Sequence, residues 1–296
     1  MEFGRLLTAM ITPFRADESL DLDGAARIAR HLVDTGSQGI VVSGTTGESP
    51  TLAHGEKLRL FETVRQAVGG RAAVIAGTGS YCTRASIELT REAEEIGVDG
   101  IMLVVPYYNN PPQEGLYRHF RAVAESTALP VMLYNIPARS PRNMEAATTL
   151  RLAEIPNIVA IKEASGKLEQ VAEIIAGAPR SFRVYSGDDS ATLPLMSLGA
   201  WGVVSVVAHV AGREIREMIE QFAAGETAAA AELHARLLPL FQACFCTTSP
   251  IPIKAALELL GLPAGPLRLP LIRADERVTA TVRAAMQELG ILGGAA

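Results

Sequence analysis

The sequence predicts a (β/α)8 barrel, known as a TIM barrel, with a small C-terminal helical extension. Short apolar, β-branched runs alternate with longer segments whose apolar residues recur every three or four positions, as in strands alternating with amphipathic helices. The strands are apolar throughout, as expected for a parallel sheet covered on both faces. Eight such units within about 210 residues fit a closed barrel better than an open doubly wound sheet. No Gly-x-Gly-x-x-Gly motif opens the first unit, which further weakens the open alternative.

The predicted strands and helices follow from these runs. We expect strands at Leu6–Thr12, Gly39–Ser43, Ala73–Gly77, Gly100–Val105, Pro130–Tyr134, Ile158–Lys162, Arg183–Ser186 and Gly202–Val207. The helical periodicity is visible at Asp23–Thr35, Glu56–Val68, Thr83–Ile96 and Gln113–Ser126. Asp23 and Thr83 are predicted N-caps, and Gly36 and Gly97 suit left-handed C-caps.

The character of the chain changes after about Gly225. Helical periodicity continues in Glu226–Phe245, Ile253–Leu260 and Asp275–Leu289, with a proline-rich connection before the last segment and no further strand pattern. We therefore expect a catalytic barrel over residues 1–224 and a helical extension over residues 225–296 packed on it.

The composition excludes several classes of protein. A hydrophobic content of 48% with 20% charged residues supplies a real core, which excludes a disordered or fibrous chain. The net charge of −5 argues against a nucleic-acid surface. Cys82, Cys244 and Cys246 are too few for a secreted disulfide framework, and we expect reduced thiols. With no recognisable signal peptide or membrane-spanning run, a soluble cytoplasmic protein is expected.

Lysine is scarce in this chain, and one of its four lysines ends a predicted strand. Lys162 follows the apolar run Ile158–Ile161, and active sites of such barrels lie at the C-terminal ends of the strands. Burial favours the neutral amine, which is the nucleophile for a Schiff base with a ketone. Pairing with Glu163 or another carboxylate is the structural alternative. The other lysines lie on predicted helices and are poor candidates: Lys57, Lys167 and Lys254.

Further polar groups converge on the same rim. Tyr134 ends the preceding strand at the height of Lys162, where a phenol can shuttle protons or simply bond a backbone carbonyl. Thr45 and Thr46, flanked by glycines, offer hydroxyl and N–H groups for a carboxylate. Arg139 has the fork geometry for a second carboxylate, with a surface ion pair as the alternative. The scattered histidines fit no metal-site spacing, so no metal is expected. A Schiff base on a lysine side chain also needs no organic cofactor.

Together these residues resemble the dihydrodipicolinate synthase family over nearly the whole chain. The matching motifs occur in the family's order: Gly44-Thr45-Thr46-Gly47-Glu48, Tyr107-Tyr108-Asn109, Tyr134-Asn135-Ile136-Pro137, Ile161-Lys162-Glu163, Ser186-Gly187-Asp188-Asp189 and Pro250-Ile251-Pro252-Ile253-Lys254. Most of them mark the wider superfamily of pyruvate-dependent class I aldolases, which includes N-acetylneuraminate lyase and keto-deoxy sugar acid aldolases. Arg139 and the Tyr107-Tyr108 pair favour the synthases.

The resemblance implies a mechanism and a place in lysine and diaminopimelate biosynthesis. Lys162 would form a Schiff base with pyruvate, and the resulting enamine would attack the aldehyde of L-aspartate 4-semialdehyde. Tyr134, Thr46 and Tyr108 would form the proton relay, with Tyr108 reaching in from a neighbouring subunit of a homotetramer built as a dimer of dimers. The residues implied in substrate binding are Thr45 and Thr46 for the pyruvate carboxylate, Arg139 for the semialdehyde carboxylate, and Gly187 and the Val204 carbonyl for the rest of the pocket.

Two other functions are compatible with the residues. Another aldolase of the superfamily would cleave a sugar-derived 2-oxo acid, and Arg139 argues against it. A catalytically silent barrel that senses a small metabolite would tolerate the loss of Lys162 or Tyr134, yet both are present.

The resemblance also bears on regulation by lysine. In regulated members the feedback site maps to Ser49, Pro50, His54, Lys57, Tyr81, Ala85 and Tyr107. Here Lys57 places a cation where a histidine is usual, Tyr81 replaces an asparagine, and Ala85 removes a carboxylate. A cationic ligand would lose its anionic partner and meet a like charge. We therefore expect weak inhibition by lysine or none.

Overall fold

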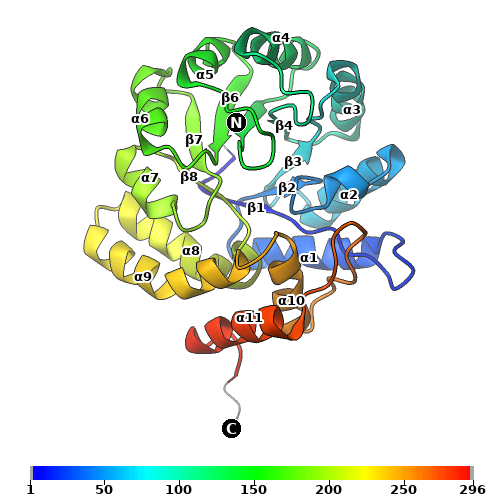
Figure 1. Ribbon diagram of the computed structural model, residues 1–296, viewed down its shortest axis with the longest axis vertical. Coiled ribbons are helices and arrows are strands. Elements are labelled where there is room, and N and C mark those ends of the chain that lie inside the picture. Colours follow the sequence, from blue (N-terminus) through cyan, green and yellow to red (C-terminus); the bar gives the residue numbers. More distant parts are fainter. Residues whose placement is uncertain (1–2, 294–296) are drawn as a thin grey trace.

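Eight parallel strands form a closed barrel in which each strand pairs with the next and β8 pairs with β1 (Figure 1). This architecture comes from a computed structural model in which residues 3–293 are described. The strands are β1 (Leu6–Ala9), β2 (Gly39–Val42), β3 (Ala73–Gly77), β4 (Gly100–Val104), β5 (Val131–Asn135), β6 (Ile158–Glu163), β7 (Arg183–Ser186) and β8 (Gly202–Ser205). The predicted (β/α)8 barrel is thus confirmed. Every predicted run overlaps its strand, and only β5 and β6 extend one residue beyond the predicted end, to Asn135 and Glu163.

Helices alternate with the strands and surround the barrel (Figure 1). They are α1 (Leu22–Asp34), α2 (His54–Val68), α3 (Thr83–Ile96), α4 (Gln113–Ala124), α5 (Ala146–Ala153), α6 (Leu168–Gly177), α7 (Thr192–Leu198) and α8 (Ala208–Ala223), with a short 3-10 helix at Ser49–Thr51.

At the helix ends, the structure contradicts the predicted N-caps but agrees with the predicted left-handed glycines. The two N-cap predictions are wrong. The Asp21 carboxylate, not Asp23, caps α1 by accepting the Gly24 N–H, and Thr83 is already helical, with its hydroxyl 2.9 Å from His119 Nδ1. Gly36 and Gly97 do have the left-handed backbone, with φ of 115° and 84°.

Two apolar layers hold the barrel together, and side-chain alternation decides which layer a residue joins. In β6, Ala160 belongs to the small cluster inside the barrel, whereas Ile161 packs in the larger layer between strands and helices. Lys162, two residues after Ala160, therefore lies on the inner face. Glu163 lies on the outer face with Ile161.

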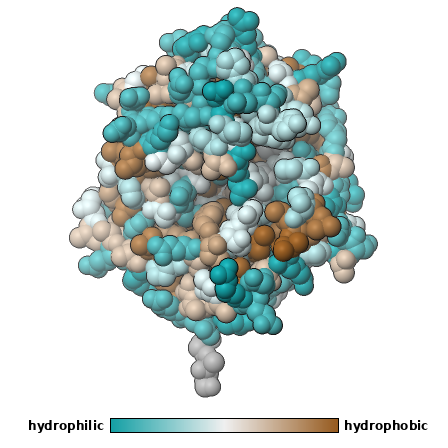
Figure 2. All heavy atoms as spheres, in the orientation of Figure 1, coloured by the Kyte–Doolittle hydropathy of each residue, from teal (hydrophilic) through white to brown (hydrophobic). Residues whose placement is uncertain are grey.

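The extension consists of α9 (Thr227–Cys244), α10 (Ile251–Leu259) and α11 (Glu276–Glu288). Helix α9 packs along α8, and α11 packs on α9 and α10 (Figure 1). The predicted division at residues 224 and 225 falls between α8 and α9, and we keep it as our proposal for the domain boundary. Leu269 and Ile272 are exposed on the proline-rich connection, over which Figure 2 shows a hydrophobic patch. No helix formed within residues 3–293 has both the length and the apolar character to cross a bilayer.

Candidate active site

Lys162 and Tyr134 face each other inside the barrel mouth. They are paired directly in the register of β5 and β6, as the sequence predicts. The Lys162 Nζ atom lies 4.4 Å from the centroid of the Tyr134 ring, and both residues are buried. An amine and a phenol are thus held side by side on rigid strands, which suits proton transfer at a bound carbonyl.

Lys162 has the electrostatic environment of a nucleophile. Burial lowers the pKa of Lys162 from 10.5 to about 8, the Asp189 charge raises it, and the Arg139 charge lowers it. The alternative of a pair with Glu163 does not fit the geometry. The Glu163 carboxylate accepts hydrogen bonds from Asn135, Ser165 and Gln170 on the outer face of the barrel.

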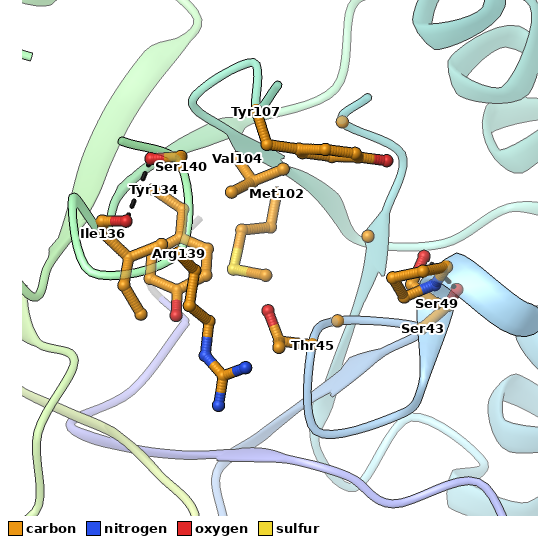
Figure 3. A pocket seen from close by; sticks show the side chains of 14 residues that line it. Ser43, Thr45, Ser49, Met102, Val104, Tyr107, Tyr134, Ile136, Arg139 and Ser140 are labelled. Carbon is orange, nitrogen blue, oxygen red and sulfur yellow. Dashed lines mark hydrogen bonds between the residues drawn. The ribbon is translucent and has the colours of Figure 1, made fainter. Parts of the chain in front are cut away.

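A cavity of about 240 Å³ opens beside Tyr134 at the same end of the barrel. Its walls come from the ends of β3, β4 and β5 and from the segments that follow β2 to β5, and they include Thr45, Tyr107, Tyr134 and Arg139. Figure 3 shows the Arg139 guanidinium, the Tyr134 phenol and the Thr45 hydroxyl directed toward one shared space. The volume corresponds to roughly eight water molecules, which suits small polar substrates.

The loop that carries Arg139 is fixed by its own backbone. The Ile136 carbonyl accepts hydrogen bonds from the Arg139 and Ser140 N–H groups, both at 3.0 Å, and from the Ser140 hydroxyl at 2.9 Å. Arg139 is exposed, and its Nη2 atom donates to the Ser249 carbonyl at 3.3 Å. A guanidinium held at the open end of a small cavity suits a substrate carboxylate.

The two threonines differ in their surroundings. Burial raises the pKa of Tyr134 to about 12, while the Arg139 charge and a hydrogen-bonding interaction with the Thr45 side chain oppose this rise. Thr46 is buried and does not line the cavity, whereas Thr45 does. Of the two hydroxyls, the structure therefore places that of Thr45 beside the phenol.

Gly187 and Val204 lie close to the same centre. A β-carbon at Gly187 would stand 3.1 Å from Lys162 Cε and 2.7 Å from the Ala164 β-carbon, so only glycine leaves room for the lysine stem. Val204 is fully buried in the inner cluster with Tyr134.

Asp189 supports this part of the rim without facing the cavity. Its carboxylate accepts hydrogen bonds from the Ser205 hydroxyl and from the Val206 N–H at 3.0 Å, which ties the end of β7 to the end of β8. Burial raises the pKa of Asp189 to about 6, and hydrogen bonds from Ser205 and Val206 oppose the rise.

Tyr108 points away from the chain that carries it. Its side chain is 92% exposed, and the residue has a left-handed backbone with φ of 68°. Its neighbour Tyr107 instead packs edge-on against Tyr81, with ring centroids 5.2 Å apart. Tyr108 therefore does not join the site within a single chain.

Comparison with known proteins decides the family. A profile of the Dihydrodipicolinate synthetase family matches residues 2–289. The chain belongs to this family. The 4-hydroxy-tetrahydrodipicolinate synthase of Moorella thermoacetica is 62% identical over 292 residues, covering 99% of this chain and 100% of that protein. The enzyme of the same name from Symbiobacterium thermophilum is 58% identical over 291 residues, covering 98% and 99% of the two chains.

Solved structures of dihydrodipicolinate synthases have the same fold. The enzyme of Cyanidioschyzon merolae, solved with lysine bound, is 50% identical with a TM-score of 0.97, covering 98% of this chain and 99% of that one. A chloride-inhibited enzyme from Acinetobacter baumannii, solved with pyruvate, is 37% identical with a TM-score of 0.95, covering 98% and 100%.

The structure also places the residues to which the resemblance maps a feedback site for lysine. Lys57 is half-buried on α2, and burial lowers its pKa. Tyr81 and Ala85 are exposed. The His54 Nε2 atom lies 2.5 Å from Glu92 Oε2, so a carboxylate that the motif comparison did not include lies near this region.

Sequence reasoning missed one group of residues altogether. Lys254 was a poor candidate because it lies on a predicted helix, yet it is buried and forms an ion pair with Glu48 next to the threonine loop. A signal was present in the sequence. In a chain with four lysines, Lys254 stands within the apolar segment Ile251–Leu257.

Proposed function

We propose that the chain catalyses the 4-hydroxy-tetrahydrodipicolinate synthase reaction, in which pyruvate condenses with L-aspartate 4-semialdehyde in diaminopimelate and lysine biosynthesis. The observation that carries this proposal is the Lys162–Tyr134 pair beside a cavity whose wall contains Arg139. Relatives that are 62% and 58% identical over nearly full length bear that enzyme's name.

Each proposed step uses a named group of the chain. The neutral amine of Lys162 attacks the ketone carbon of pyruvate, and loss of water gives the Schiff base. Removal of a methyl proton then gives an enamine, whose carbon attacks the aldehyde of the second substrate. Tyr134 transfers the protons that these steps require, because its phenol adjoins the amine. Gly187 and the Val204 carbonyl complete the pyruvate pocket.

Carboxylate binding separates this reaction from that of other aldolases. Thr45 and Thr46 would hold the pyruvate carboxylate through hydroxyl and N–H groups. Arg139 would hold the carboxylate of the semialdehyde with its paired donors. A sugar-derived substrate offers no second carboxylate at this place, so the arginine favours the synthase.

For the relay we propose Thr45 in place of Thr46. The prediction from the family motif put Thr46 between the two tyrosines. However, the Thr45 hydroxyl interacts with Tyr134 and lines the cavity (Figure 3). Thr46 keeps its role in carboxylate binding in this proposal.

We further propose a homotetramer, built as a dimer of dimers, in which Tyr108 completes the relay of a neighbouring subunit. The 92% exposure of this tyrosine supports the proposal, because an aromatic side chain so exposed is free to enter another chain. A cytoplasmic location is also proposed. The three cysteines are free thiols, which suits a reducing compartment.

The direct test is condensation of pyruvate with L-aspartate 4-semialdehyde, coupled to reduction of the product. We expect turnover in the wild type, loss of turnover in Arg139→Ala, and loss of borohydride trapping of pyruvate in Lys162→Ala. Pyruvate trapping without condensation would assign the chain to another aldolase of the superfamily. A covalent adduct that persists in Lys162→Ala would show that another amine is the nucleophile.

A further inference from the structure

We propose that Glu48 and Lys254 are positioning residues, which hold the Thr45–Thr46 loop in the geometry that binds the carboxylate of pyruvate. The helical extension is then part of the active site and not only a cover for the barrel. The proposal rests on the proposed function, because it concerns the pyruvate site of that reaction.

The loop between β2 and α2 is tightly wound. The Gly44 carbonyl accepts the N–H groups of Gly47 and Ser49, and the Thr45 carbonyl accepts that of Glu48 at 3.0 Å. Glu48 has a left-handed backbone with φ of 55°, a conformation that is unfavourable for a residue with a β-carbon. Such residues persist only where their surroundings hold them in place.

The polar partners of the Glu48 carboxylate come from the extension. Its Oε1 atom lies 2.6 Å from Lys254 Nζ, and its Oε2 atom accepts the Arg268 N–H at 3.0 Å. Lys254 also donates to the Pro266 carbonyl at 2.8 Å and lies over the Phe14 ring. The Glu48 carboxylate therefore joins the loop to α10 and to the connection that follows α10.

Because the Glu48–Lys254 pair is buried, the position of the loop depends on it. Glu48 is 2% exposed and Lys254 is 1% exposed, so neither charge has water as a substitute partner. Removing one partner of a buried pair leaves the other charge uncompensated. The loop would then have to move until Glu48 reached water, and the two threonines beside it would move too.

The same extension also touches the other side of the cavity. Ser249, two residues before α10, accepts the hydrogen bond from Arg139 through its backbone carbonyl. One short segment, Ser249–Lys254, thus contacts the arginine on one side and the threonine loop on the other. This arrangement fixes the spacing between the two groups that we assign to the two substrate carboxylates.

The test uses borohydride trapping of pyruvate on the whole enzyme, which reports pyruvate binding without the second substrate. Lys254→Met removes the charge but keeps the length of the side chain. We expect the pyruvate concentration for half-maximal trapping to rise about tenfold, as for a small displacement of binding groups. Trapping at saturating pyruvate should still reach completion, and the KM for the semialdehyde should change much less.

Glu258→Gln is the matched control. Glu258 lies one turn after Lys254 on the same helix and pairs with Arg273 at 2.8 Å, but this pair is exposed, so water can replace either partner. The control should bind pyruvate as the wild type does. Loss of pyruvate affinity in both variants would mean that any damage to the extension has this effect, and would overturn the specific role of the buried pair.

Glu48→Gln provides a second test should Lys254→Met fail to fold. The amide oxygen of glutamine still accepts the Arg268 N–H, so only the charge of the pair is lost. We expect a smaller shift in the same direction, and the double variant should be no worse than Lys254→Met because both changes break one contact. Folded variants with wild-type half-saturation would overturn the inference. Absence of trapping in the wild type would instead overturn the proposed function.

Discussion

The reactivity of the site depends on the protonation of a single amine. With a pKa of about 8, in place of 10.5, Lys162 is neutral in about a tenth of molecules at pH 7, against fewer than about one in a thousand without the shift. Burial supplies this gain, and the same burial within the barrel fixes the amine beside Tyr134.

At this residue we predict a pH dependence that follows the Lys162 amine, with a midpoint that the Asp189 charge raises. The rate of pyruvate trapping should rise as the pH increases through about 8, because the neutral amine accumulates. The Asp189 charge stabilises the ammonium form, so Asp189→Asn should move the midpoint to lower pH. Trapping rates measured from pH 6 to 10 check this, and a midpoint that rises or stays constant would contradict it.

At the scale of helices and strands, the apolar runs determine most of the architecture. Val131–Tyr134 and Ile158–Ile161 predict both strands and the pairing height of Tyr134 and Lys162, because alternation and register act locally. The cap of α1 was missed, since both Asp21 and Asp23 suit an N-cap and only backbone geometry separates them.

In the predicted site, too, local motifs identify single residues but not the contacts between residues far apart in the chain. Motifs identify the threonine pair but do not say which hydroxyl adjoins Tyr134, because neighbouring residues on a wound loop point in different directions. The Glu48–Lys254 contact joins residues far apart in the chain, so no local pattern reveals it. The proposed contact of Tyr108 is with another subunit, and neither the motif nor a single chain gives the geometry of that contact.

The prediction on regulation by lysine concerns helices α2 and α3, which contain Lys57 and Ala85. Free lysine should inhibit weakly, because Lys57 repels it and Ala85 offers no carboxylate. The relative from Cyanidioschyzon merolae was solved with lysine bound, so it is a suitable reference enzyme for the assay. Initial rates with added lysine test the prediction, and half-inhibition at sub-millimolar lysine would contradict it. The double variant Lys57→His and Ala85→Glu should become more sensitive.

The stability of the whole molecule should fall in mild acid because of a buried histidine. His209 accepts the Ile11 N–H through Nε2, its Nδ1 atom lies 2.7 Å from the Val206 carbonyl, and burial lowers its pKa from 6.5 to about 4. The folded pKa lies below the unfolded value, so the unfolded chain binds more protons between these limits. Stability is then lost as the pH falls from 6.5 to 4, by up to roughly 3 kcal/mol from this group.

The variant His209→Gln isolates that contribution. Glutamine keeps one donor and one acceptor but does not titrate, so the free energy of unfolding should depend less steeply on pH across this range. Urea unfolding at pH 7, 5.5 and 4 measures the slope. An unchanged slope would show that His209 is not the titrating group.

The assembly can be tested by mixing two inactive variants. Lys162→Ala lacks the nucleophile and Tyr108→Phe lacks the proposed relay hydroxyl of the neighbour. In a mixed dimer, one site receives Lys162 from one chain and Tyr108 from the other, so co-refolding equal amounts should restore about a quarter of wild-type activity. No recovery, with mixed oligomers demonstrated, would place Tyr108 outside the neighbouring site.

Because the extension follows the barrel in the chain, it is synthesised after all eight strands. The last of the eight strands ends at Ser205, whereas Lys254 and Arg268 come later. During synthesis the ribosome therefore releases every strand of the barrel before it adds the cationic partner of Glu48. The loop that we assign to pyruvate is the last part of the site to be fixed, and a nascent chain can close its barrel while it is still unable to hold its first substrate.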